Sequence, residues 1–200
     1  MKKEEKETIS FYNNNALEYF NSTRNVNLEH LYKEFLCYVK PQGKILDIGC
    51  GSGRDSLYFK KNGYKVTAFD GSLELVKLAS KLLNQEVLHM RFEDITLKEK
   101  YDGVWACASL LHVKRENLVE VLKNISGKLN KESGFYISFK YGNDEYVDNK
   151  GRYFNCYKEE IFKEIIEEVK DLKIEKLFKT TDLLPGRESL NWINIICVKS

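Results

Sequence analysis

The stretch Ile45-Leu-Asp-Ile-Gly-Cys-Gly-Ser-Gly53 decides how this chain folds. An apolar run leads into three glycines at alternate positions, Gly49, Gly51 and Gly53, and a helical pattern follows directly. Glycine allows a tight backbone turn and lets a ligand approach with no Cβ in the way. The stretch therefore predicts a ligand-binding turn between a buried strand and a helix, although a tight turn can need glycine for steric reasons alone.

The residues around these glycines narrow the kind of ligand. The third glycine comes one residue earlier than in the dinucleotide-binding pattern G-x-G-x-x-G. Asp47 lies two residues before Gly49. A carboxylate there would repel a pyrophosphate, whereas it suits a ligand that carries a cationic amino group. The turn therefore favours a ligand other than a dinucleotide.

A second acid, Asp70, ends the next apolar run, Val66-Thr-Ala-Phe-Asp70. It lies 21 residues after Gly49, which is the spacing that puts an acid at the tip of the neighbouring strand, where it can bind ribose hydroxyls. A helix cap or a turn is the alternative role for Asp70. The glycines and the two acids together are hard to produce by accident, so they favour a ligand-binding site over a purely steric turn.

From residue 44 onward, apolar runs of strand type alternate with helical patterns. Strands are predicted at Lys44–Ile48, Tyr64–Phe69, Glu86–Met90, Tyr101–Ala106, Gly134–Lys140, Leu172–Thr180 and Asn191–Lys199. Helices are predicted at Arg54–Asn62, Ser72–Leu83, Glu116–Leu129 and Tyr157–Val169, with Ser72 placed to cap the second of them. This order predicts an α/β fold with a seven-stranded, mostly parallel sheet and helices on both faces. The last two strands have no helix between them, so we expect an antiparallel pair at one edge, with the last strand antiparallel and the loop Asp182–Ser189 closing the pair.

The first forty residues predict a helical cap. Residues 7–39 carry apolar side chains at three- and four-residue steps, which indicates two helical segments broken near Asn21–Asn27 and ended by Pro41-Gln-Gly43. We interpret residues 1–40 as an N-terminal helical lid and residues 41–200 as the core of a single domain. Most of the aromatic stripe of the first segment, which includes Tyr12, Tyr19 and Phe20, has a simpler alternative role as the buried face of an amphipathic helix.

Composition excludes several classes of function. Lys+Arg 32 against Asp+Glu 30 leaves a net charge of +2, which gives no global electrostatic argument for binding nucleic acid or a membrane. No apolar run approaches the roughly 20 residues of a membrane span, and the charged start Met1 to Lys6 lacks a secretory signal pattern. The five cysteines form no C-x-x-C pair and the three histidines are isolated, so we expect neither a disulfide framework nor a metal site. These features predict a cytoplasmic protein.

The chain resembles the class I S-adenosylmethionine-dependent methyltransferase family. In that family an acid followed by G-x-G-x-G forms the first motif, and an acid at the end of strand two forms the second. The similarity continues through Arg91-Phe-Glu-Asp-Ile95, Tyr101-Asp-Gly-Val-Trp105 and Phe135-Tyr-Ile-Ser-Phe139 and covers roughly residues 40–200. It implies a Rossmann-like fold, S-adenosyl-L-methionine as methyl donor and S-adenosyl-L-homocysteine as product. Within the family, the compact chain resembles the small bacterial enzymes of the tellurite-resistance and thiopurine type.

The resemblance also implies a set of cofactor-binding residues. The glycines would pass under the methionine part, Asp70 would bind the ribose, and Asp47 would lie near the amino group, directly or through water. Many relatives have Gly-Asp-Ala after strand three, where this chain has Met90-Arg-Phe-Glu-Asp94, so we expect the adenine contact at Phe92 and Glu93. A solvated loop is the alternative for Glu93 and Asp94. The expected cofactor-binding residues are Asp47, Gly49, Cys50, Gly51, Gly53, Asp70, Gly71, Ser72, Phe92, Glu93, Asp94, Cys107 and Ala108.

The methyl acceptor should bind outside the carboxyl ends of the strands, where this architecture places ligands. Cations and tyrosines from the first helices and from the loops after strands four, five and six converge there, which suggests a small acidic acceptor. We expect His112, Tyr12 and Lys140 to be catalytic, Tyr19, Tyr141, Arg152, Tyr153 and Arg187 to bind substrate, and Asn155 and Tyr157 to lie in the same region.

Each of these assignments has a simpler alternative. An ordinary histidine pKa of about 6.5 suits proton transfer, whereas His112 can instead pack at a helix start and shape the pocket. Lys140 and Arg152 can be solvated loop charges, and Arg187 can form a surface ion pair with Glu188.

Methyl transfer from a sulfonium depends mostly on positioning, and a carboxylate acceptor is already ionised at pH 7. The absence of an obvious catalytic triad is therefore no objection. We predict methyl transfer to oxygen or nitrogen of a small, anionic metabolite by a monomer or homodimer with no membrane partner.

Other functions stay open. A tRNA or other nucleic-acid methyltransferase is one, although the near-neutral charge and the lack of an RNA-binding module or an Asn-Pro-Pro-Tyr segment argue against it. A nicotinamide-dependent oxidoreductase is another, against which Asp47 and the early third glycine argue. A non-catalytic cofactor-binding partner protein is the third.

Overall fold

The computed structural model describes residues 2–184 and 186–200. Three helices, α1 (Lys3–Asn14), α2 (Ala16–Thr23) and α3 (Glu29–Leu36), come before the first strand. The elements that follow are β1 (Lys44–Ile48), α4 (Arg54–Lys61), β2 (Lys65–Asp70), α5 (Leu73–Leu83), β3 (Leu88–His89), β4 (Tyr101–Ala106), α6 (Arg115–Ser126), β5 (Leu129–Lys140), β6 (Glu145–Val147), β7 (Tyr153–Asn155), α7 (Glu159–Glu167), β8 (Leu172–Thr181) and β9 (Asn191–Lys199). Short 3₁₀ turns lie at Phe92–Asp94 and Leu110–His112.

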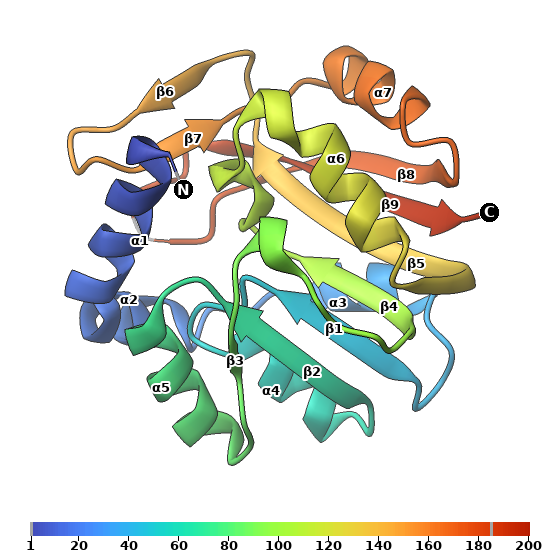
Figure 1. Ribbon diagram of the computed structural model, residues 1–200, viewed down its shortest axis with the longest axis horizontal. Helices are drawn as coiled ribbons and strands as arrows, with labels where there is room; N and C mark the ends of the chain where they lie inside the picture. The colour runs from blue at the N-terminus through green and yellow to red at the C-terminus, as the bar shows by residue number, and fades with distance from the viewer. Residues whose placement is uncertain (1, 185) are drawn as a thin grey trace.

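One sheet organises the molecule, in the strand order β3-β2-β1-β4-β5-β9-β8 (Figure 1). The first five strands pair in parallel, and β9 is antiparallel to both β5 and β8. The prediction of a seven-stranded, mostly parallel sheet with an antiparallel last strand is therefore confirmed. The strand order reverses between β1 and β4, and the carboxyl ends of these strands diverge at such a point, which leaves a crevice for a ligand.

The alternation of side chains along the strands builds two faces. Phe135, Ile137 and Phe139 of β5 pack on one face with the apolar sides of α6 and α7. The other face packs against α3, α4 and α5, where a fully buried Trp105 of β4 stacks on Tyr136 of β5 at 3.9 Å between ring centroids. Because successive side chains of a strand point to opposite faces, Tyr136, Ser138 and Lys140 all face this second side.

The N-terminal helices differ in detail from the prediction. The first helix begins at Lys3 and ends at Asn14, and the next residue, Asn15, leaves the helical backbone conformation (φ −115°, ψ 19°). The Asn15 side-chain amide donates to the Phe11 carbonyl across 2.8 Å, so it competes with the backbone and splits the predicted segment into α1 and α2. The break near Asn21–Asn27 separates α2 from α3.

Three further boundaries differ. The third strand is only Leu88–His89, and β5 starts earlier than predicted, at Leu129. The hairpin β6–β7 was not predicted, because its strands are three residues long and carry no clear alternation. The helix predicted from Tyr157 begins at Glu159, since the fully buried Tyr157 forms a bridge with Tyr141. In the predicted loop 182–189, Pro185 lies outside the described residues.

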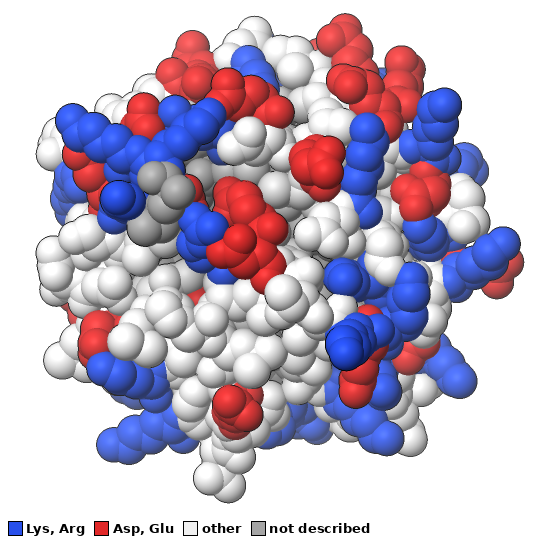
Figure 2. All heavy atoms as spheres, viewed as in Figure 1, with Lys and Arg blue, Asp and Glu red and all other residues white. Residues whose placement is uncertain are grey.

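Charge is evenly distributed on the face that Figure 2 shows, where blue and red side chains are interspersed. In the part of the chain that the structure describes, no helix is long and apolar enough to cross a membrane.

Candidate active site

Two cavities lie at the carboxyl ends of the parallel strands, beneath α1 and α2. The first, the glycine-loop cavity, has a volume of about 80 Å³ and is lined by Glu5, Thr8, Ile9, Tyr12, Tyr19, Gly49, Gly51, Asp70, Gly71, Ser72, Leu75, Met90, Arg91, Phe92, Glu93, Ala108, Ser109 and His112. The second, the sheet cavity, has a volume of about 390 Å³ and lies against β5, β8 and β9. Tyr12, Tyr19, Ala108 and His112 line both, so the two cavities meet at these four residues.

The backbone of the glycine loop needs glycine at its first two positions. Gly49 has φ +70°, and a Cβ there would lie 2.6 Å from the Ser109 Cβ. Gly51 has φ +55°, and a Cβ there would lie 3.2 Å from the Tyr19 ring. Left-handed backbone and close neighbours both exclude a side chain, so the loop presents bare backbone to the cavity.

Asp70 faces the same cavity at the end of β2. Its Oδ2 accepts from the Gly51 N–H at 2.9 Å and its Oδ1 accepts from the Ser72 N–H at 2.8 Å. Burial raises the pKa of this carboxyl, although these N–H groups oppose the shift. The cap of α5 is Ser72, whose hydroxyl accepts from the Leu75 N–H, so Asp70 is not the cap. Its remaining lone pairs are placed to accept hydroxyl groups of a ligand.

The residues present fit a nucleoside with an attached amino acid. The bare glycine backbone and the Asp70 carboxylate supply a cradle and an acceptor. In addition, the buried Ser109 hydroxyl has no hydrogen-bond partner among residues 2–184 and 186–200, and it lines the cavity. A buried polar atom without a partner is costly, and a polar ligand would satisfy it. The enclosed part of the cavity holds only about three water volumes, so we expect a ligand of nucleoside size to displace α1.

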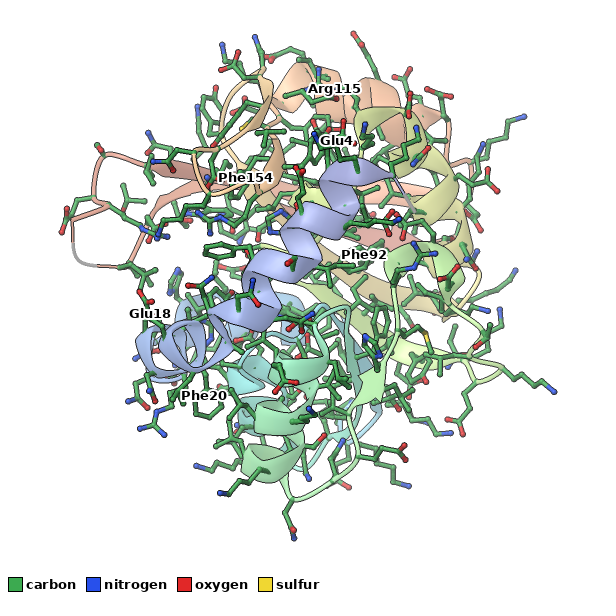
Figure 3. All side chains as sticks on the ribbon, turned by 60° about the vertical axis from the view of Figure 1, so that its left-hand side comes forward. Glu4, Glu18, Phe20, Phe92, Arg115 and Phe154 are labelled. Carbon is green, nitrogen blue, oxygen red and sulfur yellow. The ribbon has the colours of Figure 1, made fainter. Side chains whose placement is uncertain are left out.

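Contacts at both ends of α1 hold this helix over the cavity. Glu5 pairs with Arg91 at 2.5 Å on one side, and the Tyr153 N–H donates to the Thr8 hydroxyl at 3.0 Å on the other. The Ser72 hydroxyl donates to the Asn13 side chain at 2.8 Å, and Lys114 pairs with Glu4 at 3.1 Å. Figure 3 shows α1 crossing the front of the molecule with Phe92 on one side and Phe154 on the other. The first helix therefore lies over the glycine-loop cavity, and its role as a lid stays a prediction.

Asp47 lies below the glycine loop and lines neither cavity. It is fully buried, and its Oδ2 accepts from the Ser56 hydroxyl at 2.6 Å. Burial and the nearby negative charge of Asp55 raise the pKa of the Asp47 carboxyl. In this arrangement the carboxyl reaches a ligand only through a water molecule or after a rearrangement of Ser56.

Arg54, directly after the glycines, was not predicted as a site residue, yet it lines the sheet cavity. Its guanidinium donates to Asp55 at 2.5 and 3.0 Å, and Asp55 also accepts from the Tyr32 hydroxyl and from the Trp105 indole. Burial alone would raise the pKa of Asp55, but Arg54 and these donors outweigh it and lower that pKa. Asp55 therefore neutralises Arg54 and holds it rigidly at the cavity wall.

Tyr12 and His112 join the lid to the core where the cavities meet. His112 Nδ1 lies 2.6 Å from the Tyr153 carbonyl oxygen, which accepts a proton and never donates one. The imidazole therefore carries its proton on Nδ1, and Nε2 accepts from the Tyr12 hydroxyl at 2.8 Å. Burial lowers the pKa of His112 to about 4 and raises that of Tyr12 to about 12. Both groups are thus neutral near pH 7.

The floor of the sheet cavity is a satisfied polar network. The Tyr136 hydroxyl donates to the Asn194 side-chain carbonyl at 2.6 Å, and the Asn194 amide donates to the Thr180 hydroxyl at 3.0 Å. The Ser138 hydroxyl accepts from the Ala108 N–H at 2.8 Å. These residues lie on β5, β8 and β9, whose alternation points them into the cavity.

Cations line the same cavity. Arg152 is neutralised by Asp148 in a paired contact of 2.7 and 2.9 Å. Lys140 lies 3.5 Å from the centroid of the Phe154 ring and donates to the Tyr146 hydroxyl, and burial together with the charges of Arg152 and Arg187 lowers its pKa. Within the described ranges, no carboxylate pairs with Lys140 or Arg187. Glu188, the expected partner of Arg187, accepts from the Gly186 N–H instead.

The structure brings most of the expected site residues to the two cavities. The residues at one or both of them are Tyr12, Tyr19, Gly49, Gly51, Asp70, Gly71, Ser72, Phe92, Glu93, Cys107, Ala108, His112, Lys140, Arg152 and Arg187. Those that lie outside both are Asp47, Cys50, Gly53, Asp94, Tyr141, Tyr153, Asn155 and Tyr157.

The residues outside the cavities have structural contacts of their own. Cys50 packs against α5, Gly53 begins α4, and Asp94 pairs with Arg91. Tyr141 accepts from Lys179. Tyr153 holds His112 through its carbonyl, and the Asn155 amide donates to the Tyr157 hydroxyl in the interior.

Several cavity residues were missed by sequence reasoning. Arg54 follows the glycine motif directly, and Tyr136 and Ser138 share the strand alternation of Lys140, so their spacing was a usable signal. Ser109 and Trp192 gave no comparable signal. Among the described residues no group of three or more histidines, cysteines, aspartates or glutamates can hold a metal ion.

A family model and the curated relatives of this chain point to the same protein family. The family model described as tellurite resistance protein TehB matches residues 12–180. A probable S-adenosyl-L-methionine-dependent methyltransferase TehB of Haemophilus influenzae is 27% identical over 128 residues, which is 62% of this chain and 44% of that protein. An uncharacterized methyltransferase of Staphylococcus carnosus is 26% identical over 115 residues, 57% of this chain and 56% of that protein. The chain thus spans about half the length of these curated relatives.

A solved structure shares the fold over nearly the whole chain. It is a Burkholderia thailandensis 1,6-didemethyltoxoflavin-N1-methyltransferase with bound 1,6-didemethyltoxoflavin and S-adenosylhomocysteine. The TM-score is 0.78 at 18% identity, and the match covers 98% of this chain and 87% of that one. At this identity the similarity concerns the fold alone.

Proposed function

The chain belongs to the family of the tellurite resistance protein TehB, which comprises S-adenosylmethionine-dependent methyltransferases, and from this membership we propose that it methylates oxygen or nitrogen of a small, anionic metabolite. The observation that carries the proposal is the meeting of two cavities at Tyr12, Tyr19, Ala108 and His112. A donor in the glycine-loop cavity and an acceptor in the sheet cavity would face each other there.

The glycine-loop cavity is assigned to the cofactor. S-adenosylmethionine supplies a methyl group on a sulfonium, which an acceptor removes by in-line displacement. Asp70 would accept the ribose hydroxyls, Gly49 and Gly51 would let the methionine part approach the backbone, and Phe92 would border the adenine. The enzyme's contribution is to hold donor and acceptor at near-attack distance and to exclude water. Closure of α1 serves the second purpose.

The acceptor should need no general base. His112 Nε2 already accepts the Tyr12 proton, and a pKa of about 4 makes the imidazole a weak base. An ionised oxygen or a nitrogen with a free lone pair is nucleophilic without further deprotonation. In this proposal Tyr12 and His112 shape the meeting point, and Lys140, Arg152 and Arg187 attract an anionic acceptor.

The test begins with calorimetry of S-adenosylhomocysteine binding to the wild-type protein and to the Asp70→Ala variant. Protein and methyl-labelled S-adenosylmethionine are then incubated with bacterial extract, and label is counted separately in small metabolites, RNA and protein. We expect label in the small-molecule fraction, and less of it with Asp70→Ala at the same subsaturating cofactor concentration. Label confined to RNA would replace the proposal with the nucleic-acid methyltransferase alternative.

A further inference from the structure

The size and the lining of the sheet cavity narrow the chemical class of the acceptor further than the positive charge of the cavity does. Its volume of about 390 Å³ lies in the range of pockets for organic ligands and is much larger than a bare inorganic anion needs. The four cations are unequal, because Asp55 and Asp148 neutralise Arg54 and Arg152. Lys140 and Arg187 are left to bind an anion.

The carboxylate that lines the cavity, Asp182, already accepts hydrogen bonds from other groups. Asp182 Oδ2 accepts from the Trp192 indole N–H at 3.1 Å, and Asp182 Oδ1 accepts from the Leu184 N–H at 2.8 Å. Asp182 therefore fixes the indole and the loop after β8 and leaves Lys140 without a carboxylate. Trp192 is the cross-strand partner of Lys140 between β9 and β5, so a rigid aromatic surface lies next to the cation.

Two partly exposed leucines also line the cavity. Leu183 and Leu190, on the loop between β8 and β9, line it with 49% and 40% of their surface exposed. Apolar side chains that line a pocket suit an apolar part of a ligand. A ligand for this cavity thus needs a flat apolar body for Trp192 and the leucines, together with one anionic group for Lys140 and Arg187.

We propose that the methyl acceptor is an aromatic carboxylic acid, whose carboxylate binds Lys140 and Arg187 and whose ring lies against Trp192. The inference rests on the proposed function, because it assigns the sheet cavity to the acceptor. The carboxylate is the anchor, and the methyl-accepting atom lies at the other end of the molecule, toward Tyr12 and His112.

The experiment uses the full-length chain saturated with S-adenosylhomocysteine. Calorimetry measures the binding of 2-naphthoate, 2-naphthamide and sulfate. The first has both an aromatic ring and a negative charge, the second has only the ring, and the third has only the charge. A charge-assisted contact predicts that naphthoate binds about tenfold tighter than naphthamide and at least tenfold tighter than sulfate. Lys140→Met and Arg187→Gln should each reduce the naphthoate to naphthamide ratio below about threefold. Lys131→Met, on the exposed opposite end of β5, should leave the ratio unchanged.

Trp192→Leu should weaken the binding of 2-naphthamide, because its ring loses the indole surface against which it lies. S-adenosylhomocysteine binding by each variant confirms that it is folded. Equal binding of naphthoate and naphthamide, or sulfate binding as tightly as naphthoate, overturns the inference while the proposed function stands. Failure of the wild-type protein to bind S-adenosylhomocysteine would remove the proposed function and this inference with it.

Discussion

The Tyr12 hydroxyl donates a hydrogen bond to Nε2 of His112 across 2.8 Å, and this contact joins α1 to the turn after β4. It lies at the boundary of the glycine-loop cavity and the sheet cavity. Because Nδ1–H of His112 donates to the Tyr153 carbonyl, both ring nitrogens of the histidine are hydrogen-bonded. The histidine is thereby held in one tautomer, and its neutral form is part of the folded structure.

The stability of the protein should depend on pH through His112. Burial lowers its folded pKa to about 4 from an unfolded value near 6.5, so the unfolded chain binds more protons between these limits. The contribution is complete above pH 6.5 and is lost as pH falls toward 4. We expect His112→Gln to cost about 2 kcal/mol more at pH 7.5 than at pH 5, measured by urea unfolding of both proteins.

Carboxyl groups titrate in wild-type protein and variant alike, so they cancel in this difference. Tyr12→Phe keeps the imidazole and is expected to retain the pH dependence of the wild-type protein. An equal cost of His112→Gln at both pH values would show that His112 is not held neutral by burial.

Asp70→Ala should weaken S-adenosylhomocysteine binding at least tenfold. The carboxylate is held in the cavity by the N–H groups of Gly51 and Ser72, and a hydrogen bond to a charged acceptor contributes about 1.5–3 kcal/mol. Calorimetry on the wild-type protein and the variant measures the loss. Glu120→Ala, on the exposed side of α6, is the control and should bind as the wild-type protein does. Unchanged affinity of Asp70→Ala would contradict the ribose assignment.

Gly49→Ala should destabilise the fold by more than about 1 kcal/mol. The left-handed conformation alone costs an L-residue about that much, and the new Cβ would lie 2.6 Å from the Ser109 Cβ. Gly71→Ala is the matched variant, because its Cβ would meet only Ile9, at 3.7 Å. Urea unfolding should give Gly71→Ala nearly wild-type stability. Similar losses for both variants would mean that the loop tolerates a side chain at Gly49.

Movement of α1 away from the cavity should control the rate at which the cofactor dissociates. The glycine-loop cavity is too small for a nucleoside while α1 is closed, and the Glu5–Arg91 pair is one of the contacts that hold it. Loss of a partly exposed ion pair worth up to about 1 kcal/mol predicts roughly fivefold faster dissociation of S-adenosylhomocysteine from Glu5→Gln. Stopped-flow displacement measures the rate. Glu7→Gln breaks only the exposed Lys3–Glu7 pair on the same helix and should dissociate at the wild-type rate.

Much of the fold followed from local patterns. The alternation of strand and helix, the missing helix before the last strand, and the glycine stretch from Ile45 to Gly53 predicted the sheet and its ligand-binding edge, because periodicity and chirality leave few ways to connect such elements. The acid at Asp70 was placed by its distance from Gly49 in the sequence alone. Boundaries set by side-chain competition, such as the break at Asn15, were not predicted.

The tertiary structure was needed to show which charged groups are free to bind a ligand and which lone pairs already accept a hydrogen bond. Sequence separation says nothing about whether Asp55 neutralises Arg54, whether Asp182 is committed to Trp192, or whether His112 accepts from Tyr12. Arg54 and Asp55 are neighbours in the chain, but the Tyr32 and Trp105 groups that fix Asp55 come from elements distant in sequence, as do the partners Tyr12 and His112. Burial then alters the pKa values of the groups involved. Local patterns in the sequence therefore predicted the architecture and the glycine-loop edge of the sheet, whereas long-range packing sets the pairing and protonation of the side chains that line the sheet cavity.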